Sequence, residues 1–190
     1  MKNGEFSSAY GDTLKDFGIR KTAAHTLLSG YRKDGTIGKA HLAGPIIEGF
    51  AYVGSVTSAI SMIGGRSITA VEIEPSYVET GVMLGNYRSG VQKIESGVDM
   101  NRYLSSQAGK WPLASMIICL GLGFWYLDNP DQFRREALGS LIDGGLLLLS
   151  GIDEIVDIFS GYERESCGGK CVQGDRGTHV WDEYRYIEYK

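Results

Sequence analysis

The chain alternates between short continuous apolar runs and segments whose apolar residues recur at helical spacing. Continuous apolar or β-branched runs predict strands, because a strand buried on both faces carries apolar side chains at successive positions. These runs cover residues 49–54, 67–73, 91–98, 114–120 and 146–150. Helical spacing predicts helices over residues 55–63, 75–87, 100–108, 131–141 and 152–159. The alternation indicates an α/β protein.

Strands that alternate with helices are joined by right-handed crossovers, which predicts a mainly parallel sheet between two helical layers. Residues 12–31 are predicted to form one or two helices, and residues 32–49 a loop that leads into the first strand. Residues 171–173 and 178–189 predict an antiparallel C-terminal hairpin. The expected fold is a three-layer α/β sandwich closed by this hairpin. Ligands of such sheets bind beyond the carboxyl ends of the strands, where we expect the functional residues.

Composition narrows the class of protein. A length of 190 residues predicts one domain over 1–190, with residues 1–49 as an N-terminal helical cap or substrate segment. Hydrophobic residues make up 43% and charged residues 22%, which is typical of a chain that folds around a packed core. The net charge of −4 disfavours nucleic acid as a partner. A polar N-terminus and apolar runs shorter than roughly 20 residues predict a cytoplasmic protein that does not cross a membrane.

Three segments carry a recognisable order and spacing. Residues 116–130 run from a buried strand through a glycine-containing loop to an Asn-Pro pair, and residues 133–149 continue through a helix and a Gly-Gly turn into a leucine run. Residues 68–75 form a β-branched strand that ends in acidic residues before a proline. This order resembles the class I S-adenosylmethionine-dependent methyltransferases over roughly residues 50–189. The resemblance implies a Rossmann-like sandwich with S-adenosylmethionine as cofactor.

The resemblance also implies which acidic residues hold the nucleoside of the cofactor. Glu72, with Ile73 beside it, is expected to accept hydrogen bonds from both ribose hydroxyls, and Glu74 is the neighbouring alternative. Asp99, followed by Met100, is expected to accept a hydrogen bond from the adenine amino group. Each of these acids could instead be an ordinary solvated charge at a strand end or in a turn.

Two further segments of the implied cofactor site lie elsewhere in the chain. The backbone at Leu120 and Gly121 is expected to run beneath the sulfonium centre, where a glycine leaves room for close approach. Tyr10 resembles an N-terminal tyrosine that folds over the cofactor in many members of the family.

The first motif of the family has the pattern acidic-x-Gly-x-Gly-x-Gly. With the first predicted strand ending at Gly54, Tyr52 takes the acidic position, and Val56 and Ser58 replace two of the glycines. Gly54 and Ser55 are then expected to contact the methionine half of the cofactor, since amides and hydroxyls at a helix start can bind a carboxylate. This register predicts a weakened cofactor site. Its Gly-Ser opening also resembles nicotianamine synthase, which uses the same cofactor.

The expected reaction is methyl transfer by in-line displacement, for which positioning and exclusion of water supply much of the rate. If the acceptor is a hydroxyl or amine, the candidate bases are Tyr126, His41 and Asp128. No metal site is predicted, because the histidines are scattered. Cys167 and Cys171 have zinc-ligand spacing, but a flexible turn with two thiols, or a redox-linked disulfide, accounts for them without a metal.

We therefore expect a methyltransferase that acts on a small-molecule or protein acceptor. The altered first motif favours an alternative, in which a noncatalytic Rossmann-like protein serves as a binding or regulatory partner. A second alternative keeps the cofactor and transfers its aminocarboxypropyl group, as the likeness to nicotianamine synthase suggests.

Overall fold

A computed structural model describes residues 5–87, 90–107, 110, 113–122, 129–151, 165–166 and 184–190 of the chain. The first half contains α1 (Glu5–Asp34), α2 (Lys39–Ala43), β1 (Pro45–Gly49), α3 (Ser55–Met62), β2 (Ser67–Glu72), α4 (Pro75–Met83) and β3 (Val91–Ser96). The second half contains α5 (Met100–Gln107), β4 (Ala114–Leu122), α6 (Pro130–Ser140), β5 (Leu141–Gly151), β6 (Glu165–Ser166) and β7 (Tyr184–Tyr189).

The strands form one sheet in the order β3-β2-β1-β4-β5-β7-β6. The first five strands are parallel to their neighbours, while β7 runs antiparallel to both β5 and β6. The mainly parallel α/β sandwich is confirmed. At the C-terminus, β7 lies within the predicted segment 178–189, whereas residues 171–173 lie outside the described part of the chain.

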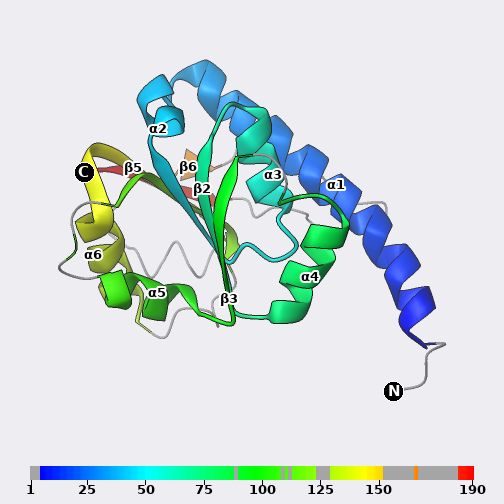
Figure 1. The fold of residues 1–190 in the computed structure, drawn as a ribbon. Coiled ribbons are helices and arrows are strands. Elements are labelled where there is room, and N and C mark those ends of the chain that lie inside the picture. Colours follow the sequence, from blue (N-terminus) through cyan, green and yellow to red (C-terminus); the bar gives the residue numbers. More distant parts are fainter. Residues whose placement is uncertain are drawn as a thin grey trace.

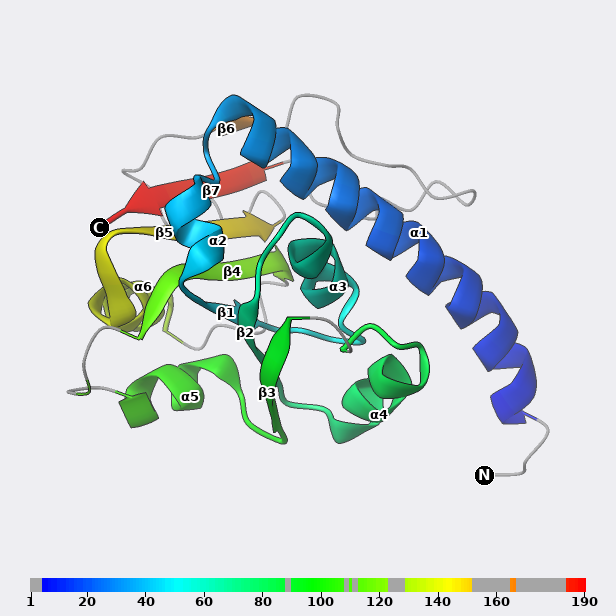
Figure 2. The same ribbon diagram turned by 45° about the horizontal axis from the view of Figure 1, so that its top comes forward.

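The two faces of the sheet are covered by different helices, as Figures 1 and 2 show. Successive strand residues point to opposite faces. Ile46 on β1 packs in the core beneath α1 and α3, whereas its neighbour Ile47 packs in the core beneath α5 and α6. A third, smaller core joins α4 to β2 through Val78 and Ala70. Because the helices cover the two faces of the sheet, a binding site is expected at the carboxyl ends of the strands.

The start of the sheet differs from the sequence prediction. β1 occupies Pro45–Gly49 instead of residues 49–54, and α1 is a single helix that continues through Gly18. The apolar run after β1 is a compact turn, because Phe50 and Tyr52 have φ angles of 56° and 51°, which no strand accommodates. Its apolar character comes from burial: Val53 is fully buried although it lies in no strand.

The entry into β5 also differs from its predicted form. The Gly-Gly turn at residues 143–145 lies inside β5, where the pairing with β4 shifts from Leu141 opposite Ala114 to Leu146 opposite Met116. Gly144 has a φ of 73° at this irregularity. The predicted turn is therefore a bulge that precedes the buried leucine run.

Candidate functional site

The carboxyl ends of β1 and β2 bring two buried acidic side chains to the same edge of the sheet. Glu48 lies near the end of β1 and Glu72 at the end of β2, two positions beyond Ala70, which pairs with Glu48. The exposed fractions of Glu48 and Glu72 are 1% and 5%. Buried carboxyl groups without a cationic partner are rare in structural roles, so this pair marks a candidate site.

Glu48 has one engaged oxygen and one without a partner. The Thr57 hydroxyl on α3 donates to its Oε2. Its Oε1 is buried and has no hydrogen-bond partner within the described residues. Burial raises the pKa of Glu48 to about 8, since the hydrogen bonds from Thr57 only partly offset the desolvation and the nearby Glu72 raises it further. At neutral pH the Glu48 carboxyl is therefore largely protonated.

The turn after β1 corrects the expected register of the first motif. Glu48 stands six residues before Gly54, the spacing between the acid and the last glycine of the pattern acidic-x-Gly-x-Gly-x-Gly. Phe50 and Tyr52 then occupy the positions of the first two glycines. All three positions have left-handed backbone, with φ angles of 56°, 51° and 72° for Phe50, Tyr52 and Gly54. Glu48 therefore stands at the acidic position of the pattern. The backbone at Phe50 and Tyr52 adopts the left-handed conformation that glycine favours, although both residues carry aromatic side chains.

Tyr52 therefore does not replace the acid, contrary to the sequence prediction. The prediction failed because it placed the first strand four residues too late, at an apolar run that the structure folds as a turn. The signal that could have located Glu48 is the acidic residue within the Pro-Ile-Ile-Glu-Gly segment at positions 45–49.

The first turn of α3 adds a second buried polar atom without a partner. Ser55 is the first residue of α3 and is 5% exposed. Its Oγ, like Oε1 of Glu48, has no hydrogen-bond partner among the described residues. Hydroxyls and free amides at a helix start attract a carboxylate, and a buried carboxyl group attracts a cation once it ionises. The turn between β1 and α3 therefore has the donor and acceptor set that a zwitterionic amino-acid group requires.

Glu72 is held by the backbone on both of its oxygens. The amide of Tyr52 donates to Oε2 over 2.6 Å, and the amide of Glu74 donates to Oε1 over 2.9 Å. The Tyr52 ring lies edge-on to Tyr77 of α4, with a centroid separation of 4.3 Å. Glu74 serves as the N-cap of α4, where its side chain accepts from the Ser76 amide. Each Glu72 oxygen retains one further lone-pair direction for a ligand hydroxyl.

Five other predicted cofactor residues lie near the carboxyl ends of the strands, in different surroundings. Ile73 is 54% exposed just beyond β2, whereas Met100 and Leu120 are buried in the cores. Asp99 lies between β3 and α5, where its Oδ1 accepts from the Arg102 amide over 2.8 Å. Gly121 lies in the last part of β4. Tyr10 falls in α1, but its side chain is outside the described residues.

Of the three predicted bases, His41 is the one that lies in the described part of the chain, and it lies away from this edge of the sheet. His41 lies on α2 before the amino end of β1, the end of the strand opposite Glu48. Its Nδ1 accepts from the Gly38 amide over 3.0 Å, and its Nε2 lies 3.1 Å from the Gly144 carbonyl oxygen. Both ring nitrogens of His41 are engaged in these hydrogen bonds. His41 also lies at the end of β1 opposite the one near Glu48 and Glu72. Tyr126 and Asp128 lie outside the described residues, as do Cys167 and Cys171.

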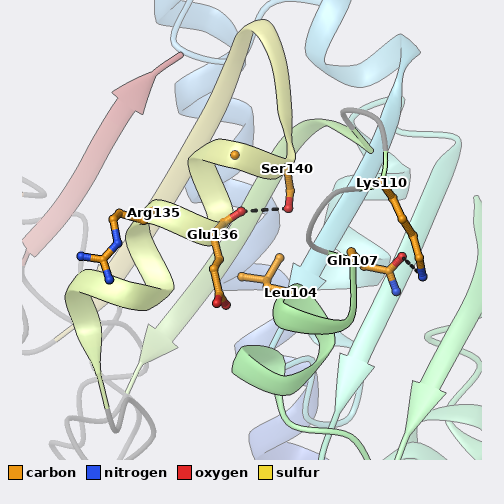
Figure 3. Close-up of a pocket in the computed structure, with 7 residues that line it drawn as sticks. Leu104, Gln107, Lys110, Arg135, Glu136 and Ser140 are labelled. Carbon is orange, nitrogen blue, oxygen red and sulfur yellow. Dashed lines mark hydrogen bonds between the residues drawn. The ribbon is translucent and has the colours of Figure 1, made fainter.

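A cavity between α5 and α6 is distinct from the strand-end site. It has a volume of about 250 Å³ and is lined by residues that include Gln107, Lys110, Arg135 and Ser140. Figure 3 shows Lys110 and Arg135 on opposite sides of it, and Lys110 donates to Gln107 over 3.2 Å. Among the described lining residues, these two cations do not converge on one point.

The sequence predicts neither a metal site nor a membrane-spanning helix. Within the described ranges, no group of three or more His, Cys, Asp or Glu side chains could hold a metal ion. In the same part of the chain, no helix combines the length and apolar character that crossing a membrane requires.

Comparison with solved structures identifies the fold. A Methanococcus maripaludis protein assigned to the S-adenosyl-L-methionine-dependent methyltransferases has a TM-score of 0.58 and 15% identity, covering 95% of this chain and 92% of its own. The N-methyltransferase NodS from Bradyrhizobium japonicum has a TM-score of 0.51 and 16% identity, covering 91% of this chain and 94% of its own.

A further similar structure contains the demethylated cofactor. The Haemonchus contortus phosphoethanolamine N-methyltransferase 1, solved with phosphoethanolamine and S-adenosylhomocysteine, has a TM-score of 0.53 and 12% identity, covering 70% of this chain and 26% of its own. No family model and no curated protein sequence matches the chain. The chain has the Rossmann-like fold of the class I S-adenosylmethionine-dependent methyltransferases.

Proposed function

We propose that this protein is an S-adenosylmethionine-dependent methyltransferase that acts on a small-molecule or protein acceptor. The observation that carries the proposal is the turn between β1 and α3. There, two buried polar atoms that have no hydrogen-bond partner in the described part of the chain, Oε1 of Glu48 and Oγ of Ser55, flank a left-handed backbone of the kind glycine adopts. These atoms fit the ammonium and carboxylate of the methionine half of the cofactor.

In this proposal the residues of the chain bind and orient the cofactor, which supplies the activated methyl group. Glu48 accepts the ammonium group and releases its own proton when it does so. Ser55 and the amides at the start of α3 hold the carboxylate. Glu72 accepts from the ribose hydroxyls, and Asp99, whose second oxygen is not used for the α5 cap, accepts from the adenine amino group.

The burial of Glu72 sets a condition on cofactor binding. Glu72 is 5% exposed, so a ribose reaches it only when the side chains that cover it turn aside, while the turn backbone keeps the bond from the Tyr52 amide. This closed arrangement favours a second candidate function, a noncatalytic binding protein that keeps the fold without using the cofactor.

The two candidates are separated by calorimetric titration with S-adenosylhomocysteine and S-adenosylmethionine at about pH 8.5. A methyltransferase should bind both ligands in roughly the micromolar range. Glu48→Gln should weaken binding about tenfold, because one charge-assisted hydrogen bond is lost. The matched control is Glu136→Gln, a carboxylate on α6 that accepts from Ser105 and Gln132 instead.

Absence of heat for both ligands with folded wild-type protein would reject the methyltransferase in favour of the binding protein. Equal binding by wild type and Glu48→Gln would show that the cofactor binds without the Glu48 carboxylate, which would remove the observation that carries the proposal.

A further inference from the structure

The left-handed residues of the β1–α3 turn are supported from outside by two consecutive residues that follow α4. Asn86 donates through Nδ2 to the Val53 carbonyl over 2.8 Å, and the Tyr87 hydroxyl donates to the Tyr52 carbonyl over 2.9 Å. Both residues are buried, with exposed fractions of 5% for Asn86 and 8% for Tyr87. Adjacent carbonyls of the turn are thus held by adjacent side chains of one segment.

The packing around the Tyr87 ring is equally specific. A Cβ added at Gly54 would lie 2.7 Å from that ring, and a Cβ at Gly81 of α4 would also collide with it. The ring is therefore enclosed between the turn and α4. Burial raises the pKa of Tyr87, so its hydroxyl keeps its proton and remains a donor at physiological pH.

The orientation of Asn86 is fixed in the same way. The Lys21 ammonium on α1 donates to Asn86 Oδ1 over 3.4 Å, and the backbone amide of Asn86 donates to the Gly81 carbonyl over 3.0 Å. These contacts leave Nδ2 directed at Val53. The support extends from α1 through Asn86 to the turn.

The turn requires this support because two of its left-handed residues are not glycine. A residue with a Cβ disfavours the left-handed region, which glycine enters without a steric cost. Phe50 and Tyr52 hold that conformation at two positions where the motif pattern has glycine. Anchoring the carbonyls of Tyr52 and Val53 offsets the preference of the chain to leave it.

Resting on the function proposed above, we propose that Asn86 and Tyr87 are positioning residues that hold the β1–α3 turn in its cofactor-binding shape in place of the missing glycines. They touch no ligand themselves. They act through Tyr52, whose amide is bonded to Glu72, and through the turn that presents Ser55.

A double-mutant cycle between Tyr87→Phe and Tyr52→Gly tests this role. Tyr87→Phe should weaken S-adenosylhomocysteine binding about fivefold to tenfold, the usual effect of one lost hydrogen bond. In the Tyr52→Gly background the same substitution should change binding less than about twofold, because glycine needs no support in the left-handed region. The control is Tyr103→Phe, which removes a hydroxyl from another mostly buried tyrosine, on α5.

Amide hydrogen exchange of the peptide that contains residues 50–54 gives a readout that needs no cofactor. Exchange in that peptide should accelerate about tenfold in Tyr87→Phe and in Asn86→Asp, and should be unchanged in Tyr103→Phe. Asn86→Asp keeps the side-chain shape and removes the donor to Val53, so it tests the proposal should Tyr87→Phe not fold.

The outcomes separate this inference from the proposed function. If wild type binds no S-adenosylhomocysteine but exchange in residues 50–54 accelerates as expected, the support of the turn stands and the cofactor assignment fails. Equal loss of affinity from Tyr87→Phe in both backgrounds, or unchanged exchange in both variants, would overturn the positioning role.

Discussion

The backbone amide of Tyr52 donates a 2.6 Å hydrogen bond to Oε2 of Glu72, which ties the turn after β1 to the end of β2. The bond joins a left-handed residue to a carboxylate that is 5% exposed. The acid expected to bind the ribose therefore also fixes the turn expected to bind the methionine half. Binding of the two halves of the cofactor should be coupled through this bond.

Replacing Glu72 by Gln should destabilise the fold as well as the site. The amide nitrogen of Gln cannot accept a hydrogen bond, so the Tyr52 or the Glu74 amide loses its buried acceptor, at a cost of about 1–3 kcal/mol. Denaturant unfolding measures the free-energy difference. Glu79→Gln on the exposed side of α4 is the control and should leave stability within about 0.5 kcal/mol. Equal stability of Glu72→Gln and wild type would mean that the two backbone bonds contribute nothing.

Stability should fall as pH rises, because Glu48 is buried in its protonated form. The folded pKa of about 8 lies above the ordinary value of 4.5 for a glutamate side chain, so the unfolded chain releases this proton at lower pH than the folded one. The contribution is fully present below about pH 4.5 and is lost as pH rises through about 8. Among the described residues, the groups that interact with Glu48 include Thr57, Glu72, Tyr87 and Cys119.

Comparison of wild type with Glu48→Gln isolates this effect from other titrations. Between about pH 5 and pH 8 the wild type should lose a few kcal/mol of unfolding free energy relative to the variant, since one pKa unit corresponds to about 1.4 kcal/mol. Parallel pH profiles for the two proteins would contradict a protonated, buried Glu48.

Cofactor affinity should rise with pH over the same range. An ammonium group next to Glu48 stabilises the ionised carboxylate, so each binding event releases up to one proton below about pH 8. Affinity for S-adenosylhomocysteine should increase by up to about tenfold per pH unit until it levels off near pH 8. Titrations in buffers of different ionisation enthalpy count the protons directly. Proton release that persists in Glu48→Gln would assign it to another group.

At position 50 a glycine should stabilise the protein more than an alanine, the reverse of their usual order in a helix. The φ of 56° at Phe50 favours glycine, so Phe50→Gly should be more stable than Phe50→Ala by about 1 kcal/mol. Comparing the two variants with each other cancels the lost contacts of the aromatic ring. At Glu79 inside α4 the order should be the opposite, with alanine more stable by about 1 kcal/mol. The thermal midpoints of the four variants provide the check, and a more stable Phe50→Ala would indicate that residue 50 leaves the left-handed region in solution.

The order of elements follows from the sequence because each depends on local periodicity. The apolar run that became β4 has no alternation of polar and apolar residues, with Ser115 as its one polar side chain before Gly121, which is typical of a strand between two helical layers. Pro75 and Pro130 begin α4 and α6 next to side chains that cap them, Glu74 and Asn129. Glu72 was placed at a strand end for the same local reason, because the β-branched run stops there.

The position of β1 and the state of Glu48 were decided by tertiary structure alone. Residues 50–53 have the composition of a strand, and tertiary contacts hold them as a left-handed turn, among them those of Tyr52 with Glu72 and Tyr87 and that of Val53 with Asn86. The proton on Glu48 depends on burial of β1 between β2 and β4, which are distant in sequence. Local propensity determines which elements form, whereas backbone strain and desolvation depend on the neighbours that the fold supplies.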